Sequence, residues 1–182
     1  MRTYPQTPSS VQAITGTSSA LKLANERVIG STTNDAQGYG QEGAHEPSPG
    51  LRALDRLVGT WELSGGTGGR VTYEWMEGGF FLIQRVNLLQ EDGTESTGME
   101  VIGHERGLGA EPSADVKSRF YGGTGDTLDY TYELKGDTLT IWFGDRGSPA
   151  YYRGTLSEDG NVLTGAWHWP GGGYEAISTR VG

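Results

Sequence analysis

The chain has 182 residues, a formal net charge of −9 and no cysteine. Because Lys and Arg form no cluster, the composition argues against a nucleic-acid surface and against binding to anionic membranes. Without cysteine the chain can form no disulfide, thiolate nucleophile or Cys-ligated metal site. No apolar run approaches the ~18 residues of a membrane-spanning helix, and the N-terminus lacks an apolar signal core. We therefore expect a cytoplasmic protein.

Residues 1–48 differ in composition from the rest of the chain. They are rich in Ser, Thr, Gly, Gln and Pro and poor in aromatic residues. Such segments cannot bury enough apolar surface to fold alone. We expect a flexible or disordered N-terminal extension over 1–48 and one domain over 49–182, since the remaining length supplies one core but not two.

A short helix is predicted at the start of this domain. Leu51, Leu54 and Leu57 recur at helical spacing. Ser48 is a preferred N-cap residue type, and Pro49 occupies the first helical position, where a missing N–H has no cost. An amphipathic turn that leads at once into a strand fits a plug over one end of a barrel.

The first strand follows the helix directly. Gly59 ends the helix, and from there the apolar period changes to two, with Trp61 on the predicted inner face. The last strand carries Arg180. If the first and last strands pair, Arg180 is expected to lie across the Trp61 ring as a cation–π contact. We assign structural roles to Gly59, Trp61 and Arg180.

Alternating runs separated by turn residues predict an all-β, ten-stranded, up-and-down antiparallel barrel with a short N-terminal plug helix. The 31 glycines gather between these runs and are interpreted as turns. A β-sandwich is the alternative, but it needs longer connections than most of these loops provide. The predicted strands span residues 59–64, 70–76, 80–89, 98–105, 117–121, 128–134, 138–143, 151–156, 162–169 and 174–181.

The two ends of this domain resemble a known superfamily. Gly59-Thr60-Trp61 after a short helix, with an Arg in the final strand, is similar to the calycins: lipocalins, fatty-acid-binding proteins and their relatives. Residues 65–69 stand where fatty-acid-binding proteins carry a helical lid. Residues 78–85 resemble an uncharacterised bacterial group of lipocalin-like barrels, similar in layout to the haem-binding nitrobindins. The resemblance covers 49–182 and implies a cavity for a small molecule.

A ten-stranded barrel has room inside for a small ligand, so its inward-facing residues are the candidate binding groups. Large aromatic side chains on the strands are candidates for the walls, and polar residues within strands are candidates for anchors. We infer which residues of each strand point into the barrel from the alternation of apolar and polar residues along the strand. The candidate ligand-binding residues are Tyr73, Trp75, Gln84, Arg85, Tyr130, Tyr132, Trp142, Tyr152, Trp167 and His168.

Candidate catalytic residues are Arg85, Glu100 and His104. Arg85 lies in an apolar strand. Its side chain either points inward and pairs with a carboxylate such as Glu100 or with an anionic ligand, or it points outward and forms an exposed cross-strand ion pair. We favour the exposed ion pair. His104 is a candidate general base, but Glu100 lies ~13 Å away along the same strand and cannot orient it.

Three functional hypotheses remain open from the sequence. The first is binding of a small hydrophobic or aromatic molecule in the barrel. The second is a barrel enzyme of cyclase or isomerase type acting on a small hydrophobic substrate. The third is haem binding, with His168 between Trp167 and Trp169 as axial ligand. No metal site is expected, because the three histidines form no HxH or HExxH pattern. A monomer and a homodimer are both compatible with the sequence.

Overall fold

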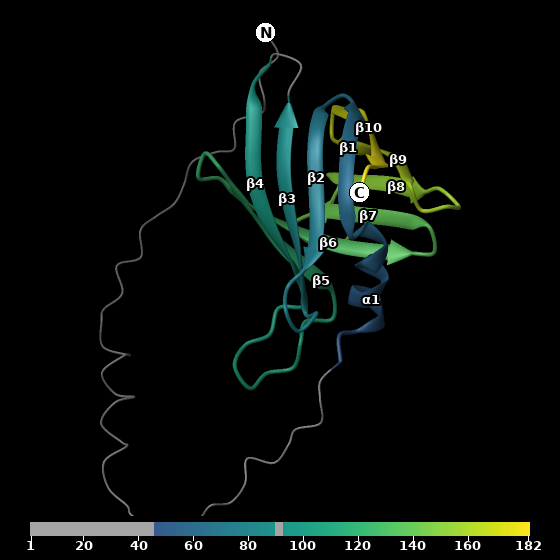
Figure 1. Ribbon diagram of the computed structural model, residues 1–182. Helices are drawn as coiled ribbons and strands as arrows, with labels where there is room; N and C mark the ends of the chain where they lie inside the picture. The colour runs from purple at the N-terminus through teal and green to yellow at the C-terminus, as the bar shows by residue number, and fades with distance from the viewer. Residues whose placement is uncertain (1–45, 90–92) are drawn as a thin grey trace, which may run out of the picture. The chain divides into compact units, whose positions relative to one another are not determined.

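The computed structural model describes residues 46–89 and 93–182. Residues 1–45 of the predicted N-terminal extension therefore lie outside the described residues. The rest forms a closed antiparallel barrel in which each strand pairs with its sequence neighbour and β1 pairs with β10 (Figure 1). The prediction of an all-β, ten-stranded up-and-down barrel is confirmed, and the sandwich alternative is wrong. The elements are α1 Pro49–Arg52, the 3-10 helix η1 Ala53–Leu57, β1 Gly59–Gly65, β2 Gly68–Trp75, β3 Phe81–Leu89, β4 Glu95–Gly103, β5 Val116–Gly122, β6 Thr127–Lys135, β7 Thr138–Phe143, β8 Tyr151–Leu156, β9 Val162–Trp169 and β10 Gly172–Arg180.

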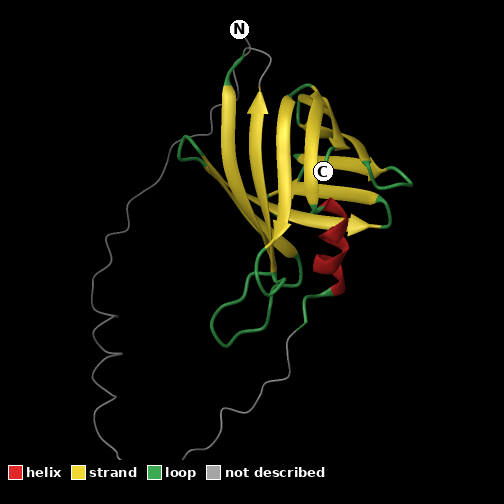
Figure 2. Ribbon diagram, viewed as in Figure 1, coloured by secondary structure: helices red, strands yellow, loops and turns green. Residues whose placement is uncertain are grey.

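The helical segment lies at one end of the barrel, beside the start of β1 (Figure 2). The Ser48 hydroxyl accepts a hydrogen bond from the Leu51 N–H at 3.1 Å, and Pro49 occupies the first turn, as predicted. Leu51, Leu54 and Leu57 are each at most 1% exposed. They join the core formed by the strand ends, so this segment acts as an apolar plug.

Closure of the barrel places Trp61 directly opposite Arg180. The guanidinium carbon of Arg180 lies 4.2 Å from the centroid of the Trp61 ring, so the predicted cation–π contact is present. Arg180 also donates hydrogen bonds to the carbonyl oxygens of Val58 and Arg56. Gly59 has φ 123°, and a Cβ there would meet the Arg180 guanidinium at 2.7 Å. Only glycine, which has no Cβ, allows the guanidinium to come this close to the backbone.

Several glycines lie inside strands rather than in turns, which corrects the expectation that glycines serve as turns alone. A Cβ at Gly98 on β4 would collide with the Phe120 ring. A Cβ at Gly154 on β8 would collide with the Tyr152 hydroxyl, and one at Gly165 on β9 would meet the same hydroxyl at 2.7 Å. The missing side chains therefore provide space inside the barrel for large aromatic rings.

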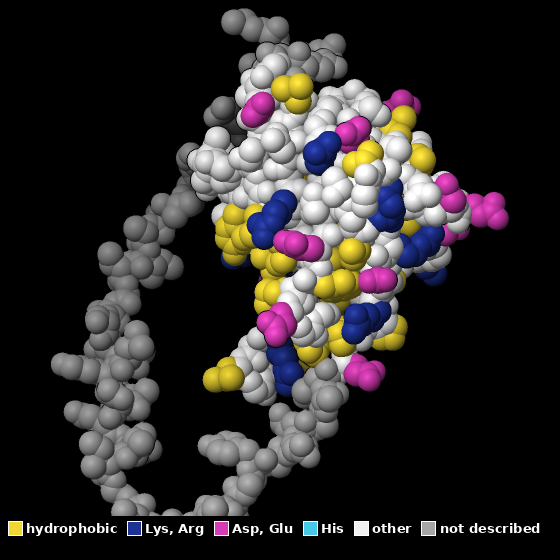
Figure 3. All heavy atoms as spheres, in the orientation of Figure 1, with side chains coloured by type: hydrophobic (Ala, Val, Ile, Leu, Met, Phe, Trp, Pro, Cys, Tyr) yellow, Lys and Arg dark blue, Asp and Glu magenta, His cyan; other side chains and the backbone are white. Residues whose placement is uncertain are grey.

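The outer wall carries mixed charges. On the face formed by β1–β4, basic and acidic side chains are interspersed and form no patch of one sign (Figure 3). Cross-strand ion pairs such as Arg70–Glu62, at 3.0 Å, account for this arrangement. Within residues 46–89 and 93–182, no helix has the length and apolar character needed to cross a membrane.

Candidate functional site

A row of polar side chains crosses the inner face of the barrel. Successive strand residues point to opposite faces, so positions paired across the sheet share a face. Tyr73 on β2 lies opposite Gln84 on β3, and Gln84 lies opposite Glu100 on β4. Ser118 on β5 and Tyr132 on β6 complete this row, and both are buried. The neighbouring strands thus bring together five polar residues that are distant in sequence.

Glu100 is the acidic group of this row. It is 3% exposed, and its two carboxyl oxygens accept separate hydrogen bonds. The Ser118 hydroxyl donates to Oε1, and the Tyr132 hydroxyl donates to Oε2 at 3.1 Å. Burial raises the pKa of Glu100 to about 7, while the bonds from Ser118 and Tyr132 oppose that rise. The carboxyl therefore changes its charge near neutral pH.

The second part of the row is a neutral pair. The Gln84 amide donates to the Tyr73 hydroxyl at 2.6 Å, and Gln84 is 9% exposed. Burial raises the pKa of Tyr73 above its ordinary value, and that of Tyr132 likewise. Both phenols accordingly stay protonated at physiological pH and supply hydrogen-bonding groups without charge.

Aromatic rings continue the inner face from β6 across to β9. The Trp167 ring centroid lies 6.1 Å from that of Tyr130 and 5.6 Å from that of Tyr152. Tyr130 also packs edge-on against Phe143, with centroids 5.6 Å apart. Leu139 on β7 packs in the core near the plug. Phe143, four residues further along the same strand, is 46% exposed. The aromatic wall therefore extends from the polar row toward solvent, away from the plug.

Among the described residues, no cationic side chain pairs with the Glu100 carboxyl inside the barrel. Among Lys and Arg residues on the described strands, only Arg180 falls at an inward-facing position. Its guanidinium is bound to carbonyl oxygens at the plug, over Trp61. An ionised Glu100 is thus stabilised by hydroxyl donors alone.

Seven predicted site residues meet inside the barrel. They comprise the aromatic wall, the neutral pair and the buried acid. The structure thereby joins candidates from the predicted binding set with one from the predicted catalytic set. These residues are Tyr73, Gln84, Glu100, Tyr130, Tyr132, Tyr152 and Trp167.

Arg85 does not belong to this interior group. It is 57% exposed on the outer wall and forms an ion pair with Glu74 at 3.2 Å. The inward alternative, in which Arg85 pairs with Glu100 or an anionic ligand, is therefore wrong. The favoured alternative of an exposed cross-strand pair is confirmed, with Glu74 on β2 as the partner. Alternation along β3 explains the difference, since Gln84 and Arg85 must face opposite ways.

His104 has a structural position at the plug end of the barrel. Its Nδ1 lies 2.7 Å from the Ser113 carbonyl oxygen, which can only accept, so Nδ1 carries the proton. Its Nε2 then accepts from the Ser48 hydroxyl, also at 2.7 Å. Both ring nitrogens are thus occupied, and His104 links the helix N-cap to the loop after β4. The general-base hypothesis for His104 finds no support in this geometry.

Two further candidates face the outer wall, and a third lies at the plug. Trp142 faces outward beneath the Arg146 guanidinium, whose carbon is 4.9 Å from its ring centroid. His168 is exposed on the outer face and stacks on Tyr151, with centroids 5.0 Å apart. Trp75 donates to Asp55 at 2.8 Å and thereby ties β2 to the plug. The placements of Trp142 and His168 correct the prediction that these residues line a cavity, whereas Trp75 keeps the inner face of β2, opposite Leu82, and packs against the core beside the plug.

The placement of the histidines bears on the haem hypothesis. In the part of the chain that the structure describes, the histidines are His104, whose two ring nitrogens are both hydrogen-bonded, and His168, which is exposed on the outer face. These two histidines therefore offer no free axial ligand to a haem inside the barrel. The described residues also contain no group of three or more His, Asp or Glu side chains that could hold a metal ion.

Two interior residues were not predicted from the sequence. Ser118 orients Glu100, and Phe143 extends the aromatic wall. Ser118 could have been predicted to face inward, because it lies two residues from both Val116 and Phe120 on β5 and so points to the same inner face. Phe143 could not, since Trp142 beside it is an equally good candidate for the inner face.

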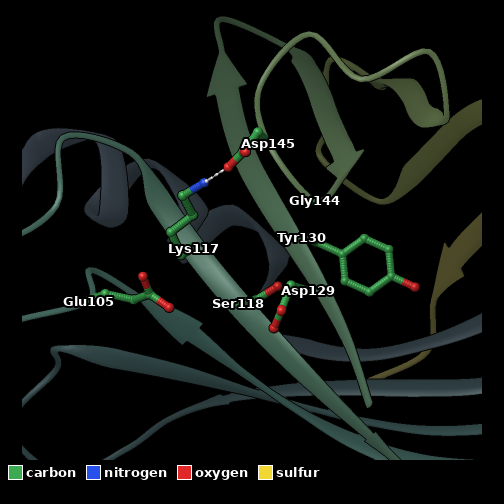
Figure 4. A pocket seen from close by; sticks show the side chains of 7 residues that line it. All are labelled: Glu105, Lys117, Ser118, Asp129, Tyr130, Gly144 and Asp145. Atoms are coloured by element: carbon green, nitrogen blue, oxygen red, sulfur yellow. Dashed lines mark hydrogen bonds and ion pairs between the residues drawn. The ribbon is translucent and has the colours of Figure 1, made fainter. Parts of the chain in front are cut away.

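A small pocket opens beside β5 and β6, and its lining includes Ser118 and Tyr130 of the interior group. Its volume is about 140 Å³, and in Figure 4 the Tyr130 ring points away from the side chains of Glu105 and Lys117. The Lys117 ammonium donates to Asp145 at 2.7 Å across it. Ligand sites usually enclose ~300 Å³ or more with largely apolar walls, so this small polar pocket is not the candidate site.

The fold and the interior residues define a closed antiparallel β-barrel with a buried acid beneath an aromatic wall. No protein-family model matches the chain. No curated protein is significantly similar to it in sequence.

Proposed function

We propose that this protein is a member of the calycin superfamily that binds a small hydrophobic or aromatic molecule inside its barrel. The superfamily assignment is supported by the sequential antiparallel closure, the plug helix and the position of Arg180 over Trp61. These are the features on which the resemblance in sequence depends.

The observation that carries the binding proposal is the buried Glu100 carboxyl beneath aromatic side chains. A buried carboxyl that has no cationic partner among the described residues opposes folding once it ionises. Perturbed acids of this kind concentrate at functional sites. The neighbouring rings of Tyr130, Tyr152 and Trp167 supply the apolar surface that a small ligand needs.

Native mass spectrometry of protein purified from its own host tests the proposal directly. We expect a co-purified small molecule that is released on denaturation. A fluorescent apolar probe should also bind, and Trp167→Ala should weaken that binding at least tenfold. Trp142→Ala is the matched control, because Trp142 lies on the outer wall. A protein with no co-purified molecule and no probe binding would contradict the proposal.

A barrel enzyme is the second candidate, favoured by the protonation behaviour of Glu100. A carboxyl whose pKa is about 7 can both take and give a proton at neutral pH, as a general acid or base requires. The bonded Ser118 and Tyr132 hydroxyls hold it in one orientation. The co-purified molecule separates the two candidates: Glu100→Gln should abolish its conversion and retain its binding if the protein is an enzyme.

A further inference from the structure

Among the described residues, the inner site contains one acidic side chain, Glu100, and no Lys or Arg side chain that pairs with it. The Glu100 carboxyl is buried. A bound anion would place two like charges together in the buried interior, which is strongly unfavourable. A neutral ligand would leave the ionised carboxylate without a counter-charge. A cationic ligand would supply the missing counter-charge.

The hydroxyl donors around Glu100 leave it free to accept more. Ser118 donates to one carboxyl oxygen and Tyr132 to the other. An ionised carboxylate has about four lone-pair sites, so each oxygen can accept a further hydrogen bond. An ammonium group carries the N–H donors that would use this capacity, and a charge-assisted bond of this kind is stronger than a neutral one.

The walls near Glu100 are also suited to a positive charge. The face of an aromatic ring is electronegative and attracts cations within ~6 Å of its centroid, most strongly for Trp and then Tyr. Tyr130, Tyr152 and Trp167 form a contiguous group of such rings. The phenols of Tyr73 and Tyr130 lie close enough to Glu100 for its charge to raise their pKa values. Acid and aromatic wall therefore belong to one site.

We infer that the ligand is a small organic cation, such as a protonated aromatic amine, whose ammonium group pairs with Glu100 while its apolar part packs against Tyr130, Tyr152 and Trp167. This inference rests on the proposed function, which requires only that some small apolar molecule enters the barrel. It adds the charge of that molecule and names the residue that selects it.

The inference predicts a direction of pH dependence. The cation needs ionised Glu100, whose pKa is raised to about 7 by burial, so affinity should increase from pH 6 to pH 8. The titratable groups that face Glu100 are the phenols of Tyr73, Tyr130 and Tyr132, and burial raises their pKa values so that they stay neutral over this range. Binding near neutral pH should release protons, because the ammonium group pairs with the ionised carboxyl and part of the Glu100 population is protonated beforehand.

Isothermal titration with matched probes tests this charge preference. Tryptamine, tryptophol and indole-3-acetate share one ring system and present a cation, a neutral hydroxyl and an anion; benzylamine, benzyl alcohol and benzoate form a smaller series. We expect the amine of at least one series to bind at least tenfold more tightly than its alcohol at pH 8, and its acid to bind most weakly. Glu100→Gln should remove the preference and the proton release. Glu74→Gln on the outer wall should change neither.

The possible results separate this inference from the proposed function. Equal affinity for amine and alcohol, or a preference for the acid, would overturn the inference and leave the proposed function standing. Binding of the apolar fluorescent probe alone, without any of the six compounds, would have the same consequence. Absence of all binding, probe included, would overturn both. If Glu100→Gln alters the fold, the pH dependence and proton release of the wild-type protein still decide the question.

Discussion

The buried Glu100 should make the stability of the barrel depend on pH in a defined direction. Its pKa in the folded state is raised from 4.5 to about 7, because burial disfavours the charged form. The favourable contribution of the protonated carboxyl is fully present below pH 4.5 and is lost as pH rises through 7. A pKa rise of this size corresponds to about 3 kcal/mol.

Replacement of Glu100 by Gln isolates this effect. Glutamine has nearly the same shape and can hydrogen-bond to Ser118 and Tyr132, but it does not ionise. We expect the free energy of unfolding of Glu100→Gln, relative to wild type, to increase by about 3 kcal/mol between pH 4.5 and pH 8.5. Urea denaturation at several pH values measures this difference, and contributions from other titrating groups cancel between the two proteins.

Glu74→Gln serves as the matched control, because Glu74 forms an exposed ion pair with Arg85. Exposed pairs of this kind contribute ~1 kcal/mol or less, so this variant should stay close to wild type at every pH. An unfolding free energy of Glu100→Gln that tracks wild type in parallel from pH 4.5 to pH 8.5 would refute the reasoning. Glu100 would then titrate alike in the folded and unfolded chains.

Three further substitutions probe the closure, the interior and the plug. Arg180→Met should lower the unfolding free energy by about 3 kcal/mol, because it removes a cation–π contact and charged hydrogen bonds to buried carbonyls. Gly154→Ala should lower it by about 1–3 kcal/mol, since the added methyl collides with the Tyr152 hydroxyl. Ser48→Ala should lower it by about 1–2 kcal/mol through loss of the N-cap and of the bond to His104. Urea denaturation measures all three.

Each of these substitutions has a counterpart or an outcome that separates it from a general loss of stability. Arg153→Met removes an exposed guanidinium over Tyr151 and should cost less than 1 kcal/mol. Gly107→Ala adds a methyl that meets only the Ala110 side chain, at 3.7 Å, and should be nearly neutral. For Ser48, a variant as stable as wild type would show that the N-cap contributes nothing to the plug.

The strand order could be predicted because turns and alternation are explicit in the sequence. Gly78 and Gly79 take positive φ in the turn between β2 and β3, as the local residues indicate. Ser48 and Pro49 likewise mark the helix start that the structure shows. These signals are local, and an up-and-down barrel needs few others, since every strand pairs with its sequence neighbours and only the closing β1–β10 pairing joins strands distant in sequence.

Strand facing could not be predicted wherever both faces of a strand carry apolar residues. On β3, Ile83 is 8% exposed on the outer wall, while Gln84 is 9% exposed on the inner face. Burial thus differs little between the two faces, and hydrophobicity alone gives no direction. On β7 the outward Trp142 is covered by Arg146 from the following loop, a contact that alternation cannot reveal.

The interior acid is the part of the barrel whose chemistry folding alone does not explain. Domains of this size are stable by about 5–15 kcal/mol, so a cost of about 3 kcal/mol at alkaline pH is a large fraction of the total. Glutamine at position 100 could bond to the same two hydroxyls without that cost. The outer ion pairs contribute ~1 kcal/mol or less each and carry no comparable conflict. A function that uses the charge of Glu100 resolves the conflict, because a bound cation would offset the cost of ionisation inside the barrel.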